Sequence, residues 1–547
     1  MDLNLATLYE VIADAVGDEA ALIHGDRILS WSEIDDRAAR LAAAISAAGL
    51  GPSSKVAQYL YNCPEYLESC YAGLKVRGVP VNVNYRYLKD ELRYLLDNSE
   101  AEALFFHGSL AERVAEVRDQ LPGLKLLVQV DDGAPLLDGA VLYDDVLAAH
   151  QPMARIERSD DDIVMLYTGG TTGMPKGVMY RCGDVYGATL FAIAALAGTS
   201  RPQTPEELAE LARTLRPKGL SPVHLPAGPL MHGAAIASSI AALLAAGTVV
   251  TLTSRHFDAD ELWKAVQDRR VTRISIVGDP FGRPMADALE EAASAGKPYD
   301  VSSLRELDST GTMFSEPVKE RILAHADIKI VDNLASSEAP GMGSTEVTRG
   351  SSGQTAKFKL GPFAAVFTED HRRVEAGSGE VGLLAVSGVV PLGYYKDPEK
   401  SARTFPTIEG RRWSVPGDFA TVEADGTIAL LGRGSVCINT AGEKVFPEEV
   451  EEVVKEAPAV EDCLVVGVPD EKYGEAVTAV VSLRAGASAG EDDLRAFVHG
   501  RLAGYKCPRR FVIVDAVRRA PNGKADYPWA REVSLRRFSV AHAVEDH

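Results

Sequence analysis

The sequence is poor in cysteine, lacks a long apolar run and has no excess of positive charge. Its six cysteines lie far apart, with no CxxC pair and no histidine at metal-ligand spacing, so neither a disulfide framework nor a cysteine zinc site is expected. No stretch of about 18 uninterrupted apolar residues occurs, and no basic segment precedes an apolar run at the N-terminus. We therefore expect no membrane span, no signal peptide and a cytoplasmic location.

Negative charge dominates the chain. Its 547 residues hold 57 Lys and Arg against 78 Asp and Glu, a formal net charge of −21. Because this field repels nucleic acid and anionic lipid surfaces, no nucleic-acid partner is expected. An anionic substrate would need a local site. The hydrophobic content of 46% excludes disorder and allows more than one buried core.

Short apolar runs alternate with helical patterns over the first 130 residues, as a parallel sheet covered by helices requires. The runs ALIHG and RILSW flank a Gly-Asp turn and predict a hairpin. Ser32 is the expected N-cap of the following amphipathic helix, with Asp35 approximating a capping box and Gly49 as the stop. Further strands are expected at KVAQYL, VPVNV, ALFFH and KLLVQV, with helices over 64–77 and 88–98. The pattern predicts an α/β fold with doubly wound sheets.

A second α/β region runs from about 162 to 331, interrupted by an insertion at 195–225 that contains the short helix PEELAELARTL. After Asp418 the pattern changes to short strands around helices at 447–456 and 491–502, which is typical of an α+β domain. A boundary near Arg433 divides the chain into 1–432 and 433–547, the second a normal domain size. The acidic tail after Trp529 is expected to be loosely attached.

The most informative stretch is YTGGTTGMPKG, from Tyr167 to Gly177, directly after the apolar run IVML. Its glycines free backbone N–H groups to surround an anion, and its threonine hydroxyls add donors. It is not a Walker A loop, because Met174 and Pro175 precede Lys176 and no hydroxyl residue follows that lysine. The stretch predicts a phosphate-binding loop. A flexible surface turn is the alternative, but so many small and hydroxyl residues before Pro-Lys-Gly are unusual in a mere turn.

At this loop the chain resembles the adenylate-forming superfamily, which includes acyl-CoA synthetases, peptide-synthetase adenylation domains and beetle luciferases. Further motifs of that superfamily follow in order: SerThrGlyThrMet at 309–313, Ser337-Glu338, Pro416-Gly417-Asp418, Gly432-Arg433 and PNGK at 521–524. The resemblance implies a large N-terminal domain of doubly wound sheets plus a β-subdomain, and a small α+β C-terminal mobile domain. It implies ATP, Mg²⁺ and CoA as cofactor and co-substrates, and it allows a homodimer.

The motif positions give the expected nucleotide site. The resemblance implies ATP contacts at Thr168, Gly169, Gly170, Thr171, Thr172, Gly173, Lys176, Gly311, Ser337, Asp418 and Arg433. The Glu338 carboxylate follows the strand IKIVDN, at the position where α/β sheets bind ligands, and Mg²⁺ prefers such an oxygen; Thr172 is the second expected metal ligand. Alone, Glu338 would be a solvated loop acid and Asp418 part of a plain turn.

In addition to Glu338, Lys524 and His232 are the expected catalytic residues. Lys524 follows a Pro-Asn-Gly turn, from which its ammonium could meet the substrate carboxylate and α-phosphate as charge develops. Without the other motifs it would be an ordinary exposed lysine. His232 in PLMHGAA matches the position beside the substrate carboxylate in acyl-activating members, although a lone histidine there is more often a core residue. Met231, Phe281 and the run 234–246 are candidates for an acyl pocket.

The chain lacks the acidic residue with which amino-acid-activating relatives pair a substrate ammonium, so a carboxylic acid without an α-amine is expected. GRGSVCIN, GEKVFPEEVE and GDPFGRP look most like actinobacterial ligases acting on fatty acids or steroid side-chain acids. Ser435, Asn439 and Leu334 depart from the usual hinge and adenine-stacking residues.

The resulting hypothesis is an AMP-forming acyl-CoA synthetase. ATP and a small-molecule carboxylate would give an acyl-adenylate and pyrophosphate, and CoA would then form the thioester. Residues 442–445 and the Tyr505-Lys506 neighbourhood are candidate contacts for CoA. Two alternatives stay open: an enzyme that loads a carrier protein, which would share every motif, and a noncatalytic member, against which Lys176, Glu338 and Lys524 argue.

Overall fold

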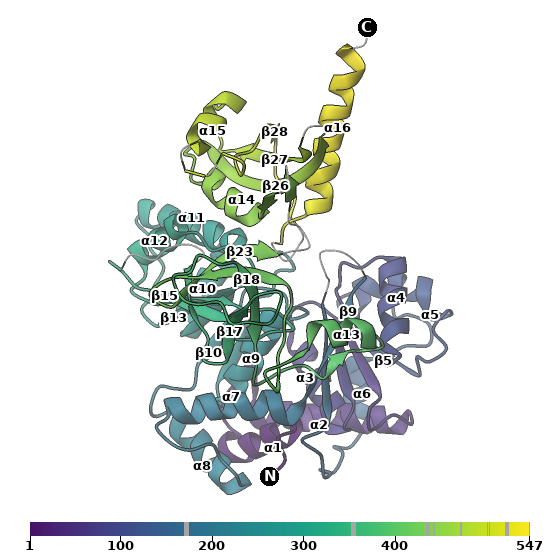
Figure 1. The fold of residues 1–547 in the computed structure, drawn as a ribbon. Helices are drawn as coiled ribbons and strands as arrows, with labels where there is room; N and C mark the ends of the chain where they lie inside the picture. Colours follow the sequence, from purple (N-terminus) through teal and green to yellow (C-terminus); the bar gives the residue numbers. More distant parts are fainter. Residues whose placement is uncertain are drawn as a thin grey trace. The chain divides into compact units, whose positions relative to one another are not determined.

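The computed structural model describes residues 1–168, 174–351, 357–433, 438–440, 443–470, 473–499, 501–502, 504–519 and 524–545. The chain forms two compact units (Figure 1). Unit 1 comprises Met1–Thr355 and Ser387–Ser414, and unit 2 comprises Ala356–Val386 and Val415–His547. No helix in the described ranges is both long and apolar enough to cross a membrane.

Unit 1 contains two large sheets of mainly parallel strands. The first has the order β19-β9-β8-β4-β3-β5-β6-β7. Its strands are β3 (Lys55–Tyr59), β4 (Val79–Asn82), β5 (Ala101–His107), β6 (Leu126–Val130), β7 (Val141–Leu142), β8 (Ile163–Thr168), β9 (Lys176–Arg181) and β19 (Gly393–Tyr394). The antiparallel strands β9 and β19 close one edge. The four strands expected in the first 130 residues are confirmed.

The second sheet of unit 1 has the order β15-β14-β13-β12-β10-β11-β1-β2. Its strands are β1 (Ala20–His24), β2 (Arg27–Ser30), β10 (Val223–Pro226), β11 (Thr248–Thr251), β12 (Arg273–Ile276), β13 (Glu306–Thr310), β14 (Lys329–Leu334) and β15 (Gly343–Val347). The predicted hairpin is the antiparallel pair β1–β2. Outside these sheets, β20 (Thr407–Ile408) pairs with β21 (Arg411–Arg412).

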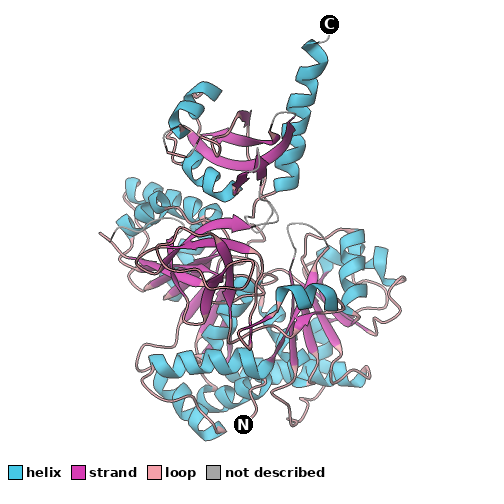
Figure 2. Ribbon diagram, viewed as in Figure 1, coloured by secondary structure: helices cyan, strands magenta, loops and turns pink. Residues whose placement is uncertain are grey.

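Helices cover both faces of the two sheets (Figure 2). They are α1 (Leu5–Val16), α2 (Trp31–Ala47), α3 (Pro64–Lys75), α4 (Lys89–Ser99), the 3₁₀ turn η1 (Gly108–Leu110), α5 (Ala111–Arg118), α6 (Tyr143–Ala149), α7 (Cys182–Leu196), α8 (Pro205–Leu215), α9 (Gly233–Leu244), α10 (Ala259–Arg269), α11 (Asp279–Ser294), α12 (Glu316–His325) and α13 (Pro398–Thr404). One apolar core, built from α1–α3 and α7–α9, lies between the sheets, while α4–α5 and α10–α12 cover the outer faces. The doubly wound α/β prediction is confirmed.

The cap of α2 corrects a detail of the sequence analysis. The N-cap is Ser30, not Ser32. Ser30 Oγ accepts a hydrogen bond from the Glu33 N–H, and the Glu33 carboxylate accepts one from the Ser30 N–H. Ser32 instead lies inside the first turn. The helix begins at Trp31 because this capping box satisfies two N–H groups at its start.

The strands of unit 2 fall into two groups. One is antiparallel, in the order β17-β18-β22-β23-β16, with β16 (Lys357–Leu360), β17 (Ala364–Phe367), β18 (Gly382–Val386), β22 (Asp418–Val422) and β23 (Thr427–Arg433). The other contains β24 (Ile438–Thr440), β25 (Glu443–Val445), β26 (Val460–Asp470), β27 (Gly474–Leu483) and β28 (Arg510–Val514). The helices are α14 (Pro447–Lys455), α15 (Glu491–Val498) and α16 (Tyr527–Glu545). The predicted boundary at Arg433 falls at the end of β23.

Through Phe538, the C-terminal segment is packed rather than loosely attached, contrary to expectation. It forms α16, whose Ala530 and Ser534 are fully buried and whose Trp529 and Phe538 pack with apolar residues of β26–β28. The guanidinium of Arg510 lies 4.9 Å from the centre of the Phe538 ring. The many charges of this segment hid an apolar face with helical spacing.

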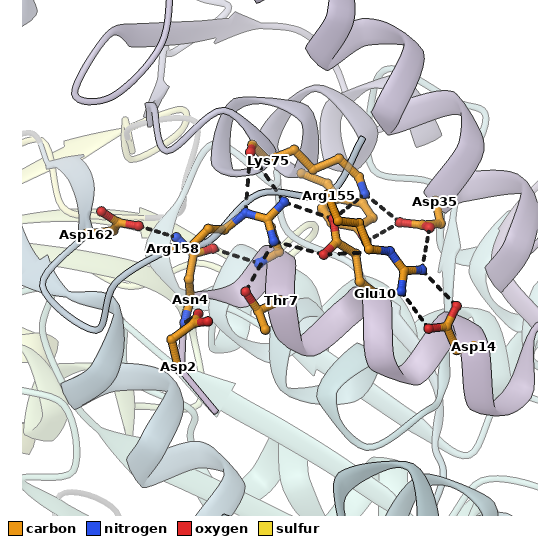
Figure 3. Close-up of polar contacts among 12 residues, drawn as sticks. Asp2, Asn4, Thr7, Glu10, Asp14, Asp35, Lys75, Arg155, Arg158 and Asp162 are labelled. Carbon is orange, nitrogen blue, oxygen red and sulfur yellow. Dashed lines mark hydrogen bonds and ion pairs between the residues drawn. The ribbon is translucent and has the colours of Figure 1, made fainter. Parts of the chain in front are cut away.

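A buried ion network joins α1, α2 and α3 to the segment before β8 (Figure 3). Glu10 accepts from Lys75 at 2.8 Å and from both terminal nitrogens of Arg158 at 2.8 and 2.9 Å. Lys75 also donates to Asp35 at 2.6 Å, and Arg155 joins Asp35 to Asp14. The Glu10, Lys75 and Arg158 side chains are at most 5% exposed. Because each charge faces an opposite one, the network fixes these elements together without leaving a buried charge unpaired.

Candidate active site

The predicted phosphate loop connects two adjacent antiparallel strands. β8 ends at Thr168 and β9 begins at Lys176, and these two residues are partners in the β8–β9 register. Gly169, Gly170, Thr171, Thr172 and Gly173 lie outside the described residues. A strand–loop–strand connection differs from the strand–loop–helix of a Walker A site, in agreement with the sequence argument.

Asn82 at the end of β4 anchors the base of this loop, a role that the sequence analysis missed. Its side-chain oxygen accepts the N–H of Tyr167 at 2.7 Å, and its amide donates to the carbonyls of Tyr167 at 2.8 Å and Met231 at 2.6 Å. One buried amide thus ties β8 to the chain just before His232. The only sequence signal was an asparagine ending an otherwise apolar strand.

Lys176 lies among residues from the late segment of unit 1. Its ammonium pairs with Asp397 and lies 5.8 Å from the centre of the Tyr394 ring. Lys176 also lowers the pKa of the Asp397 carboxyl. No motif in the sequence pointed to Tyr394 or Asp397.

Glu338 is held at its backbone and at its carboxylate. The Tyr394 hydroxyl donates to Glu338 Oε1 at 2.9 Å, and Ser414 Oγ donates to the Glu338 carbonyl at 2.6 Å. The Tyr180 hydroxyl donates to the carbonyl of Ser337 at 2.9 Å. No described residue donates to Glu338 Oε2. The structure therefore brings Lys176, Ser337 and Glu338 together in unit 1.

This arrangement fits a magnesium–polyphosphate group. A half-exposed carboxylate with one oxygen available is the kind of protein ligand that Mg²⁺ takes alongside phosphate oxygens. No group of three His, Cys, Asp or Glu side chains forms a metal cage in the described ranges. Such a cage is not needed, because Mg²⁺ in nucleotide sites is usually bound by one or two carboxylates, water and phosphates.

The predicted adenine-binding segment, residues 309–313, packs closely against the start of α11. Gly311 follows β13 with φ +98°, a conformation that favours glycine. Gly278 has φ +56°, and a Cβ there would lie 2.3 Å from the Met313 carbonyl oxygen, so only glycine permits this close approach. Thr312 Oγ1 donates to the Val277 carbonyl at 3.2 Å, and Asp279 accepts the Ser315 N–H at 2.8 Å. These contacts fix the loop after β13.

His232 is the N-cap residue of α9, and its N–H donates to the Pro229 carbonyl at 3.0 Å. The next residue, Gly233, lies against β8 and the Ser337 loop: a Cβ there would be 2.8 Å from Leu166 and 3.4 Å from Ser337 Oγ. The His232 backbone is therefore next to the Ser337–Glu338 segment. Met231 is 2% exposed, and Phe281 packs edge-to-face on Phe257 at 4.7 Å within the apolar core.

A buried polar cluster beside α9 was also missed by the sequence analysis. His224 Nε2 lies 3.0 Å from Ser238 Oγ, which is itself 3.0 Å from Ser275 Oγ. Burial is the main cause that lowers the pKa of the fully buried His224 to about 3, so this imidazole is neutral at physiological pH. The cluster joins β10, α9 and β12, and Ser238 is partly exposed.

Asp418, Arg433 and Lys524 belong to unit 2. Asp418 is 5% exposed and is the register partner of Arg433 in the β22–β23 pair. Lys524 is partly buried just before α16. In the expected CoA region, Lys506 donates to Glu449 at 2.6 Å, and Tyr505 and Lys506 line a pocket of about 570 Å³. Ser435 lies outside the described residues, as do Ala441 and Gly442.

Comparison with protein families gives two matches. The model for "AMP-binding enzyme" matches residues 9–395, and the model for "AMP-binding enzyme C-terminal domain" matches residues 449–524. Among solved structures, the anthranilate CoA ligase AuaEII in complex with anthranoyl-AMP superposes with a TM-score of 0.80 at 20% identity, covering 99% of this chain and 98% of that one. ATP-bound MatB from Rhodopseudomonas palustris gives a TM-score of 0.79 at 23% identity, covering 97% and 99%.

Curated relatives align over almost their full length. A 3-oxocholest-4-en-26-oate–CoA ligase of Rhodococcus rhodochrous is 41% identical over 541 residues, which cover 97% of this chain and 96% of the relative. A medium/long-chain-fatty-acid–CoA/3-oxocholest-4-en-26-oate–CoA ligase of Mycolicibacterium smegmatis is 40% identical, covering 98% and 97%. The resemblance seen in the motifs is thereby confirmed, and the chain belongs to the AMP-binding enzyme family of adenylate-forming enzymes.

Proposed function

We propose that this protein activates a fatty acid or a steroid side-chain acid through an acyl-adenylate to its CoA thioester, releasing AMP and pyrophosphate. The reaction class, AMP-forming acid–CoA ligation, is that of the curated relatives, which are named CoA ligases at about 40% identity. The acyl group is inferred from the names of the same relatives. The missing acidic partner for a substrate ammonium supports an acid without an α-amine.

One observation carries the proposal: Lys176 and the adjacent pair Ser337-Glu338, which are remote in sequence from Lys176, lie together, with Lys176 and Glu338 at Tyr394 and the Ser337 carbonyl at the Tyr180 hydroxyl. An ammonium beside a carboxylate with an available oxygen is the pair that ATP with Mg²⁺ requires. When bound, Mg²⁺ neutralises phosphate charge and orients the leaving pyrophosphate. The Tyr394 hydroxyl orients the Glu338 carboxylate, and the Ser414 hydrogen bond fixes the backbone that carries it.

The remaining roles are proposed from the motif positions. Thr168, Gly169, Gly170, Thr171, Thr172 and Gly173 would surround the phosphates, with Thr172 as the second metal ligand, while Gly311, Asp418 and Arg433 would bind the nucleoside. Lys524 would stabilise charge on the carboxylate and α-phosphate during adenylation, and His232 would contact the substrate carboxylate. We propose that residues 433–547 form a mobile domain that turns after this step to admit CoA. The proposal includes a cytoplasmic location and allows a homodimer. Sedimentation velocity tests the oligomeric state.

The test of function is acid-dependent release of AMP with a panel of short, medium, long, aromatic and steroid carboxylates. Formation of acyl-CoA from free CoA distinguishes the ligase from an enzyme that loads a carrier protein. Absence of AMP release with every acid would point to a noncatalytic member and overturn the proposal.

A variant separates the two half-reactions. Lys524→Ala should abolish formation of the acyl-adenylate and leave thioester formation from supplied acyl-adenylate largely intact. The matched control is Lys359→Ala, because Lys359 is an exposed lysine of unit 2 outside every motif. Pyrophosphate release at the wild-type rate by Lys524→Ala would refute the role of Lys524.

A further inference from the structure

A second lysine, Lys400, lies beside Lys176 in unit 1. Lys400 is in the first turn of α13, and its ammonium is 5.0 Å from the centre of the Tyr394 ring, while the Lys176 ammonium is 5.8 Å from the same ring. The hydroxyl of this ring donates to Glu338. Two ammonium groups and the expected magnesium ligand therefore surround one buried tyrosine.

The neighbouring carboxylate does not pair with the Lys400 side chain. Asp397 uses Oδ1 to accept the backbone N–H of Lys400 at 3.0 Å, as the cap of α13, and uses Oδ2 for the ammonium of Lys176. Within the described part of the chain, no carboxylate forms an ion pair with the Lys400 ammonium. Lys400 is partly buried rather than fully solvated.

The proximity of Lys400 to Lys176 disfavours the charged form of the Lys400 ammonium. Burial and the charge of Lys176 lower the pKa of the Lys400 ammonium, and Glu338 and Asp397 only partly compensate. Even a partly buried cation is less stable next to a like charge, and an added anion relieves this repulsion. The side-chain charges of Lys176, Lys400, Asp397 and Glu338 cancel, so a divalent cation at Glu338 would give the group a charge of +2 and favour a polyanion.

We propose that Lys400 binds the pyrophosphoryl group of ATP together with Lys176, and holds the pyrophosphate product after adenylation. The proposal rests on the proposed function, because it concerns the same site. It distinguishes Lys400 from the exposed Lys396, which is four positions earlier and pairs with Glu100 at 3.1 Å. Two ammonium groups on one leaving group would stabilise the charge that develops as the bond to the α-phosphate breaks.

The experiment measures binding of inorganic pyrophosphate with Mg²⁺ to the full-length protein by isothermal titration calorimetry. Lys400→Ala should raise the Kd by about 10- to 100-fold, as expected for the loss of a hydrogen bond between charged groups. Lys400→Arg should restore part of the affinity. Lys396→Ala, the matched control, should bind like the wild type. Circular dichroism and thermal melting check that each variant is folded.

Kinetics supply the second readout. In the reverse reaction from supplied acyl-adenylate, Lys400→Ala should raise the KM for pyrophosphate by a similar factor, while thioester formation from the same acyl-adenylate and CoA stays unchanged. A Kd within about twofold of the wild type would overturn the inference, as would a wild type that does not bind pyrophosphate. If pyrophosphate binds through Lys400 but no acid yields AMP, the proposed function fails and the anion site stands.

Discussion

Removal of one charge from the buried ion network of α1 should strongly destabilise unit 1. Glu10 is the acid that two nearly inaccessible cations share, because it accepts from Lys75 and from both terminal nitrogens of Arg158. Glu10→Gln keeps the shape and removes the charge. Lys75 would retain Asp35, but no other described carboxylate pairs with Arg158.

The magnitude follows from the burial of the partners. Side-chain exposures of 5% for Glu10, 3% for Lys75 and 1% for Arg158 leave little access for water to compensate. Breaking a buried pair by removing one partner costs about 3–5 kcal/mol. The neighbouring pair Asp14–Arg155 is 60% and 46% exposed on its two side chains, so Asp14→Asn should cost only about 0–1 kcal/mol.

The assay is urea unfolding followed by tryptophan fluorescence. Three of the four tryptophans, Trp31, Trp263 and Trp413, belong to unit 1, so the signal reports mainly on that unit. The free energy of unfolding comes from the midpoint and slope of the unit 1 transition. If Glu10→Gln were within about 1 kcal/mol of the wild type, or no worse than Asp14→Asn, the argument from buried charge would be wrong.

Three further predictions concern the site. Glu338→Gln should lower kcat/KM for adenylation by about 100-fold or more at unchanged thermal stability. The control is Glu346→Gln, because Glu346 is exposed. A small loss of kcat/KM in Glu338→Gln would exclude Glu338 as a metal ligand. Gly278→Ala should raise the KM for ATP more than the KM for the acid, because its Cβ would meet the Met313 carbonyl oxygen. The control is Gly296→Ala, at φ +70° in open space, which should change neither KM. Equal effects of the two variants on the KM for ATP would refute the role of the contact between Gly278 and Met313. His224 has a depressed pKa when folded, so the unfolded state binds more protons below pH 6.5 and stability falls as the pH drops towards 3. His224→Gln should remove about 1.6 kcal/mol of that loss between pH 6.5 and 5, measured by urea midpoints. An unchanged pH dependence would refute this prediction.

Local patterns predicted the elements better than the contacts between them. The alternation of apolar runs predicted the strands β3 to β6, because buried parallel strands need apolar side chains on both faces. The α2 cap was displaced by two residues, since two serines each have an acid three positions later and only the backbone decides between them. The apolar face of α16 was missed because many charged residues interrupt it.

The motifs led to Lys176, Ser337 and Glu338 but not to the residues that orient them. Tyr394, Asp397 and Ser414 come from a segment without a recognisable signature, and their contacts arise only when β19 joins the edge strand β9. Asn82 was also missed, because a single polar residue at the end of a strand forms no sequence pattern from which a role can be predicted. Sequence spacing can place a chemical group, but its supporting partners depend on tertiary packing.

The chain leaves unit 1 after Thr355 and returns to it at Ser387–Ser414. During synthesis, the Glu338 site therefore stays incomplete until the ribosome has passed Ser414, since Tyr394 and Ser414 supply its hydrogen bonds. In a nascent chain that stops before β19, the strand β9 can pair with β8 on one side, but its other side lacks β19. The order of the segments thus postpones completion of the proposed nucleotide site until the strands of unit 2 that precede Ser387 have already been made.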